Sequence, residues 1–153
     1  MCKNKKTILV SACLLGLNCR YDGASKPCAE AIALAGDYNL VPVCPEIYGG
    51  LPTPRTPSER IGDKTMMRDG TDVTENYKRG AEAALALCKS LSCDCALLKA
   101  KSPSCGKGEI YDGSFTGKLT ARDGVTAELL ASEGVRVFTE LEISQMKKYL
   151  DKN

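Results

Sequence analysis

Apolar residues along the chain gather in four short continuous runs, each bounded by polar or turn-forming residues. Runs of about 4–8 aliphatic and β-branched residues are typical of strands that are buried on both faces. One run contains Pro42, which has no N–H to donate, so we do not expect that strand in the centre of a sheet. The pattern predicts strands at residues 7–13, 40–44, 95–100 and 135–139.

Between these runs, apolar residues recur at the three- and four-residue spacing of amphipathic helices. In the longest such segment Ala81, Ala84 and Cys88 share one face, so Cys88 is most simply a core residue. Strands that alternate with helices predict an α/β sandwich with a mainly parallel sheet. We expect helices at residues 28–35 after Pro27, from Asp72 or Thr74 to 91, at 123–132 between a cap at Asp123 and a stop at Gly134, and at 142–150.

Two segments have the composition of loops and turns. Residues 45–64 contain four prolines and three glycines, which is typical of an irregular segment, and long loops inside a compact domain are usually functional or disordered. Residues 101–108 should form a tight polar loop. Residues 109–116 predict a β-hairpin, because Asp112-Gly113 is a strong two-residue turn signal.

The N-terminal stretch allows two interpretations. Residues 3–6 are mostly basic and precede an apolar run, and residues 10–13 resemble a bacterial lipoprotein cleavage box. A secretion signal needs an apolar core of about 7–15 residues before its cleavage site, but only residues 8–10 are strongly apolar here. The pattern favours a buried strand, in one domain over residues 1–153 with a flexible basic tail at 1–6.

The composition, with 43% hydrophobic and 26% charged residues, is ordinary for a soluble globular chain. No apolar run approaches the ~20 residues of a membrane helix. The formal net charge of +2 gives no strong signal for nucleic acid or membrane surfaces. The oligomeric state is not readable from these patterns.

The chain has nine cysteines and no histidine. An odd number of cysteines in a chain of this size argues against a disulfide framework, so a reducing cytoplasm is the expected location. The lack of histidine excludes Cys–His nucleophilic pairs, Ser-His-Asp triads and zinc sites that use histidine. Proton transfer must then use a carboxylate, lysine, tyrosine or cysteine.

Three cysteines stand at or just after the ends of predicted strands: Cys13, Cys44 and Cys105. Ligands of open α/β sheets collect beyond the carboxyl ends of the strands, so these thiols are expected to converge. Each could instead be a small buried apolar residue. Together they could hold zinc, completed by Cys19 or Glu46. They could also hold a [4Fe–4S] cluster with one iron left open as a Lewis acid that favours sulfur ligands.

Two polar residues lie beside these thiols in the sequence. Glu46 follows Cys44 by two positions, and in an apolar site it could move a proton near neutral pH; its alternative role is an exposed loop carboxylate. Ser102 precedes Cys105 by three positions and could orient a heterocycle through its hydroxyl. Its alternative role is to form a turn by bonding its own backbone.

The other cysteines carry weaker expectations. Cys19 is close enough to Cys13 to be a fourth ligand, a resolving thiol or a turn residue. Cys93 and Cys95 should be structural, because they would point to opposite faces of an extended chain. Cys28 should pack under the first helix, and Cys2 falls in the expected tail.

Taken in order, five segments resemble the thiouracil desulfidase family, and the resemblance runs from about residue 8 to residue 142. The combination of CPE and SPSCG is specific, whereas either piece alone would not be. The segments are SACLLGLNCRYDG, VCPEIYGGLPTPRTPSE, DVT, LKAKSPSCG and IYDGSFTG.

The resemblance implies a Rossmann-like, three-layer single domain that holds a [4Fe–4S] cluster on Cys13, Cys44 and Cys105. It implies that Glu46 is the acid–base carboxylate and that Ser102 positions the substrate. The implied activity is non-redox removal of sulfur from thiouracil, with 4-thiouracil the expected substrate, to give uracil and hydrogen sulfide. The implied partner is a small thiolated pyrimidine.

Two other functions remain open on sequence alone. One is an iron–sulfur or zinc module without chemistry of its own. The other is a thiol enzyme that uses Cys13 and Cys19 for sulfur transfer or redox exchange. Arg55 could face a substrate, or it could pair with Asp22 to fix the long loop.

Overall fold

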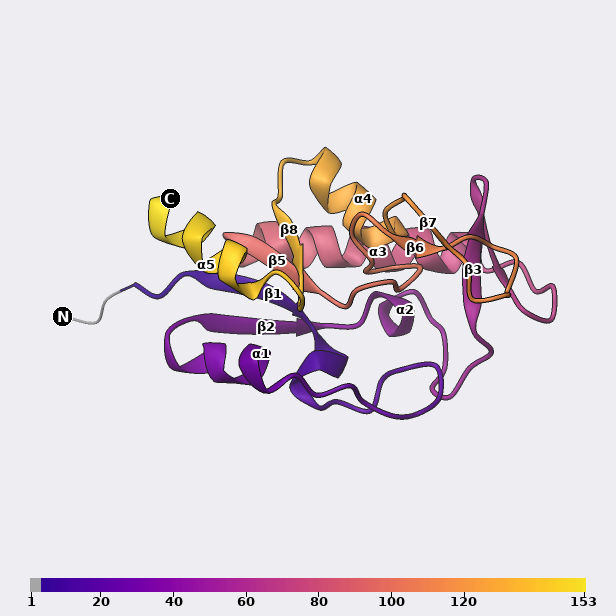
Figure 1. Cartoon of the computed structure of the whole chain (residues 1–153), viewed down its shortest axis with the longest axis horizontal. Coiled ribbons are helices and arrows are strands. Elements are labelled where there is room, and N and C mark those ends of the chain that lie inside the picture. Colours follow the sequence, from indigo (N-terminus) through magenta and orange to yellow (C-terminus); the bar gives the residue numbers. More distant parts are fainter. Residues whose placement is uncertain (1–3) are drawn as a thin grey trace.

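A computed structural model describes residues 4–153, and its centre is a four-stranded sheet (Figure 1). The strands are β1 (Thr7–Ser11), β2 (Asn39–Val43), β5 (Cys95–Leu98) and β8 (Val137–Thr139). All neighbours are parallel and the order is β2-β1-β5-β8. β2 is therefore an edge strand, which accommodates Pro42 as expected. Because every strand runs the same way, all carboxyl ends meet at one edge.

Helices cover both faces of the sheet, which gives the three predicted layers. The alternation of side chains in β1 sends Ile8 and Val10 to one face and Leu9 to the other. The first face packs against α1 (Ala29–Ala33) and α5 (Ile143–Lys152). The second packs against α3 (Thr74–Ser90) and α4 (Val125–Ser132). The predicted α/β class is confirmed.

Small elements gather beyond the carboxyl edge of the sheet, to the right in Figure 1. They are the 3₁₀ helix η1 (Ala12–Leu15), the short helix α2 (Pro45–Tyr48), the hairpin β3 (Ser58–Ile61) with β4 (Lys64–Met67), and the pair β6 (Ile110–Tyr111) with β7 (Leu119–Thr120). A further 3₁₀ helix, η2 (Leu34–Gly36), follows α1. These additions form the walls of the site described below.

The segment 45–64, expected to be irregular, is partly regular. Pro45 occupies the first turn of α2, where its missing N–H has no cost. Ser58–Ile61 then pairs antiparallel with Lys64–Met67 across Gly62-Asp63. The prediction of a loop was wrong for these parts, because prolines and glycines between short elements obscure their patterns.

Three boundaries also differ from the sequence prediction. β1 ends at Ser11, so Cys13 lies in η1 rather than in the strand. Asp112-Gly113 is not a two-residue turn, since the loop between β6 and β7 covers residues 112–118. Asp123 does not cap α4: its carboxylate instead accepts hydrogen bonds from the Gly108 N–H and the Lys107 ammonium.

The expected tail at residues 1–6 is only partly testable, because Cys2 and the rest of residues 1–3 lie outside the described residues. Lys5 and Lys6 are not a free tail, since their ammonium groups donate to the carbonyls of Gly36 and Leu150. Among residues 4–153, no helix is both long and apolar enough to pass through a membrane.

Candidate functional site

A cavity of about 410 Å³ lies at the carboxyl edge of the sheet. This volume falls within the range of small-molecule sites. The walls of the cavity are formed by η1, α2, the loop after β5 and the β3–β4 hairpin. All five residues singled out from sequence line it: Cys13, Cys44, Glu46, Ser102 and Cys105.

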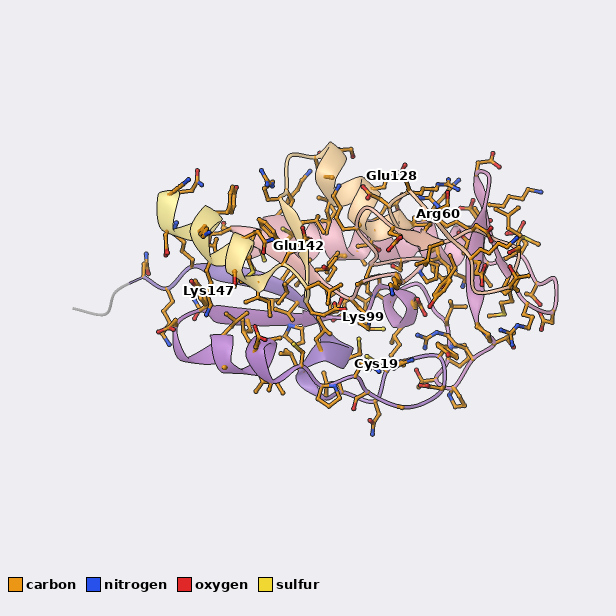
Figure 2. All side chains as sticks on the ribbon, in the orientation of Figure 1. Cys19, Arg60, Lys99, Glu128, Glu142 and Lys147 are labelled. Atoms are coloured by element: carbon orange, nitrogen blue, oxygen red, sulfur yellow. The ribbon has the colours of Figure 1, made fainter. Side chains whose placement is uncertain are left out.

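Cys13 and Cys44 are brought together by the ends of adjacent strands. η1 turns Cys13 inward directly after β1, and the Cys13 carbonyl accepts the Lys26 N–H at 3.0 Å. Cys44 is extended and precedes Pro45, so α2 begins at the end of β2. The Cys19 thiol lies between them and interacts with both thiols. Cys19 is thus a fourth thiol in this cavity, and Figure 2 shows it on the loop after η1.

Cys105 is held by the loop after β5, and Ser102 fixes that loop. The Ser102 hydroxyl oxygen accepts the N–H groups of Ser104 at 3.1 Å and Cys105 at 3.0 Å. Gly124 packs so tightly that a Cβ there would stand 2.5 Å from the Ser104 carbonyl. Ser102 therefore forms the turn that positions Cys105, while its hydroxyl proton is still available to a ligand in the cavity.

Two of the cavity thiols, Cys44 and Cys105, are held in the neutral form. Burial raises the pKa of Cys105 to about 12. A hydrogen bond with Cys19, together with burial, raises the pKa of Cys44. A thiol that binds a metal centre gives up its proton, because the metal replaces the proton as the partner of the sulfur.

The donor set suits an iron–sulfur cluster. Three thiols from remote segments line one cavity, and the chain has no histidine. Among residues 4–153, no three cysteine or carboxylate side chains stand close enough together to hold one metal ion. Sulfur donors spread around a cavity suit a larger, sulfide-bridged centre, which thiolates normally hold.

Glu46 faces Arg55 rather than apolar side chains. The Arg55 Nε donates to Glu46 Oε2 at 2.7 Å, and a second guanidinium nitrogen lies 2.5 Å from the same oxygen. The pair is largely buried, with 4% of the Arg55 side chain and 13% of the Glu46 side chain exposed. The apolar environment considered for Glu46 was wrong. Of the two alternatives for Arg55, the pair with Asp22 was wrong, since Asp22 contacts Arg20 at 3.5 Å, whereas Arg55 lines the cavity.

Arg55 also joins the two loops that carry the thiols. Its guanidinium donates to the Cys19 carbonyl at 2.9 Å, and its backbone N–H donates to the Tyr21 carbonyl at 2.8 Å. The Cys44 thiol contacts the same Cys19 carbonyl at 3.7 Å. One arginine thus orients Glu46 and fixes the loop that carries Cys19.

Tyr77 is a site residue that sequence reasoning missed. It projects from α3, is 2% exposed, and interacts with Glu46 and Ser58. Burial and the negative charge of Glu46 raise its pKa well above the ordinary value, so it is a neutral hydroxyl. Tyr77 stands four residues before Ala81 on the buried helix face, and this spacing marks it only as a core residue.

The fold and the cavity define an α/β protein with a thiol-lined site at the carboxyl edge of a parallel sheet. Residues 8–142 match the family model described as 2-thiouracil desulfurase. The chain therefore belongs to the 2-thiouracil desulfurase family.

Two individual proteins are closely similar to the chain. The uncharacterized protein YbbK of Bacillus subtilis (strain 168) is 42% identical over 149 residues, which cover 91% of this chain and 99% of YbbK. The solved structure of the [4Fe-4S]-dependent thiouracil desulfidase TudS is 45% identical. It superposes with a TM-score of 0.93 over 97% of this chain and 100% of the TudS chain.

Proposed function

We propose that this chain is a thiouracil desulfidase that depends on a [4Fe–4S] cluster and releases uracil and hydrogen sulfide. The observation that carries the proposal is one cavity lined at once by Cys13, Cys44, Cys105, Glu46 and Ser102. The similarity to TudS over the whole of both chains supports it. The choice between the 2-thio and 4-thio positions stays a prediction, with 4-thiouracil expected.

In this proposal Cys13, Cys44 and Cys105 hold the cluster. When bound by three thiolates, such a cluster supplies an open iron, a Lewis acid with affinity for sulfur. The protein contributes the three sulfur donors from three separate segments. Ser102 fixes the loop of Cys105, and Arg55 fixes the loop of Cys19, which follows η1. Cys19 remains close to two of these donors, Cys13 and Cys44.

Glu46 acts as the general base. Arg55 holds its carboxylate in place in the cavity, where in this role it accepts a proton from water. The buried Tyr77 hydroxyl restrains the same carboxylate from the side of α3. Water deprotonated by Glu46 attacks the ring carbon that bears sulfur, so that a C–O bond forms and the C–S bond breaks. The sulfur leaves as hydrogen sulfide and takes up the two protons of the water, one of them returned by Glu46. No electron transfer is needed, since oxygen replaces sulfur at one carbon without a change in oxidation state.

Ser102 positions the substrate through its hydroxyl proton. Its oxygen already accepts two backbone N–H groups, so the hydroxyl is oriented and acts toward the cavity as a donor. A pyrimidine carbonyl oxygen is a suitable acceptor. The proposed partner is thus a small thiolated pyrimidine rather than a nucleic acid.

The eight described cysteines are free, which suits a reducing cytoplasm.

The test is an anaerobic assay of sulfide and uracil, with 2-thiouracil and 4-thiouracil as substrates. Reconstituted protein should release both products in equal amounts, and protein loaded with zinc should release neither. A full cluster without sulfide release would contradict the proposal and favour a non-catalytic module. Activity that needs Cys19 but no iron would favour the thiol-transfer alternative.

A further inference from the structure

Phe115, in the loop between β6 and β7, has an unfavourable backbone conformation. Its φ is +57°, in the left-handed region that bulky residues rarely adopt. Among residues 4–153, the non-glycine residues with positive φ are Ser92, Lys101 and Phe115, and the last two line the cavity. Such conformations persist only where the surroundings enforce them, and they concentrate at functional sites.

Glu59 of β3 enforces this conformation. One carboxylate oxygen of Glu59 accepts the N–H of Gly113 at 2.9 Å and the N–H of Phe115 at 3.1 Å. The loop also lies directly against β3, since a Cβ at Gly113 would stand 2.7 Å from the Arg60 carbonyl oxygen. Glu59 is only 9% exposed. The buried carboxylate of Glu59 therefore holds the loop between β6 and β7 in place.

The Phe115 ring is not placed there for core packing. It belongs to none of the three buried apolar clusters of the described chain. It is half-buried and lines the cavity together with Arg68. The Arg68 guanidinium carbon lies 5.8 Å from the ring centroid, within the range of a cation–π contact. The strained backbone thus presents an aromatic ring to the cavity, with an arginine beside it.

We propose that Phe115 is the platform on which the pyrimidine ring of the substrate stacks, and that Glu59 positions this platform. The inference rests on the proposed function for the identity of the ring. Planar heterocycles stack on aromatic side chains whatever their substituents, so the platform would set the plane of the ring. Ser102 would then fix the rotation of the pyrimidine ring within that plane.

The kinetic test compares Phe115→Leu with Phe115→Tyr. Loss of a stacking platform should raise KM about 10- to 100-fold, with a smaller change in kcat, while Phe115→Tyr should stay within about threefold of the wild type. Glu59→Gln, a positioning change, should raise KM in the same direction. Lys118→Ala in the same loop is the matched control and should leave KM unchanged. Iron and sulfide content should be equal in all variants.

A binding test gives a readout independent of turnover. The chain has no tryptophan, so Phe115→Trp introduces a single tryptophan, whose emission can be excited selectively, at the proposed platform. Uracil should quench its emission saturably, whereas Ile32→Trp, on α1 outside the cavity, should not respond. Absence of quenching, together with a wild-type KM in Phe115→Leu, would overturn the platform. Sulfide release by the wild type would show that the proposed function survives that failure.

Discussion

The chain carries two groups of cysteines at opposite edges of one sheet, and they differ in almost every respect except residue type. Cys13, Cys44 and Cys105 line a cavity beyond the carboxyl ends of β1, β2 and β5. Cys88 and Cys93 lie near the amino end of β5, where neither lines that cavity. The first group differs from the second in its position at the carboxyl ends of the strands and in the polar residues around it. The number of cysteines alone does not reveal this difference.

The C-terminal end of α3 explains why Cys88 and Cys93 lie together. The Cys93 N–H donates to the Cys88 carbonyl at 2.9 Å, the Ser92 N–H donates to the Lys89 carbonyl at 3.2 Å, and Ser92 has a φ of +50°. This is a Schellman motif, in which residues at the positions of Cys88 and Cys93 make an apolar contact. A hydrogen bond from Cys93 lowers the pKa of Cys88.

Cys95 completes the contrast as a core residue. It is fully buried and packs on the α1 and α5 side of the sheet, whereas Cys93 packs on the α3 and α4 side. The prediction that these two cysteines face opposite ways is confirmed. The same residue type thus serves as a helix-end contact, as a core side chain and, in our proposal, as a cluster ligand.

The largest effect should come from the cavity thiols. Single changes of Cys13, Cys44 or Cys105 to Ser should abolish stable cluster binding and reduce sulfide release below detection, because in our proposal each supplies one of only three sulfur ligands. Iron and sulfide analysis after anaerobic reconstitution measures this. A full cluster in any of the three variants would remove that residue from the ligand set.

Glu46→Gln should lose activity and keep the cluster. The amide cannot accept a proton from water, so kcat should fall about 10²- to 10⁴-fold, the usual contribution of a general base. The visible absorption of the cluster and the iron content should equal those of the wild type. Glu30→Gln, an exposed change on α1, serves as the control. Near-normal turnover in Glu46→Gln would assign proton transfer to another group.

The stability of the cluster-free protein should fall at alkaline pH because of Cys95. Burial raises its pKa to about 12 from an ordinary value of 9.0. Between these values the unfolded chain loses the thiol proton and the folded chain keeps it, so the free energy of unfolding falls as pH rises. The loss should reach up to about 1.4 kcal/mol per pH unit.

Denaturant unfolding of the wild type and Cys95→Ala between pH 8 and pH 11 isolates this contribution, since the other titrating groups are common to both proteins. The wild type should lose stability more steeply than the variant above pH 9. Parallel pH profiles would contradict the assignment.

The smallest effect should come from the helix-end pair. Cys88→Ala or Cys93→Ala removes one side of an apolar contact and should lower the free energy of unfolding by about 1 kcal/mol. Sulfide release and iron content should stay at wild-type levels. A loss of cluster in either variant would contradict the claim that only the cysteines at the carboxyl edge of the sheet serve the cluster.

Much of the central fold could be predicted because the apolar runs had the length and composition of buried strands. Strand direction then made the convergence of Cys13, Cys44 and Cys105 predictable, although they are far apart in the sequence. The hairpin at 58–67 was missed, yet Gly62-Asp63 between two short strands is itself a recognised turn signal. Proline density around it favoured a loop instead.

The residues that complete the site could not be predicted from local sequence. Tyr77 has the spacing of a core residue, and its role depends on α3 packing against α2, where Glu46 lies. Glu59 acts on Phe115, which is 56 positions away along the chain. The Arg55–Glu46 pair needed the fold of the loop between them. Long-range polar contacts of this kind leave no periodic signal.

The most direct test of the central claim is iron anomalous diffraction from crystals of the anaerobically reconstituted protein. We predict one four-iron centre at the carboxyl edge of the sheet, bonded to the sulfurs of Cys13, Cys44 and Cys105, with Cys19 unbonded beside it. Iron bonded to Cys88, Cys93 or Cys95, or a cluster with four cysteine ligands and no open position, would contradict the account.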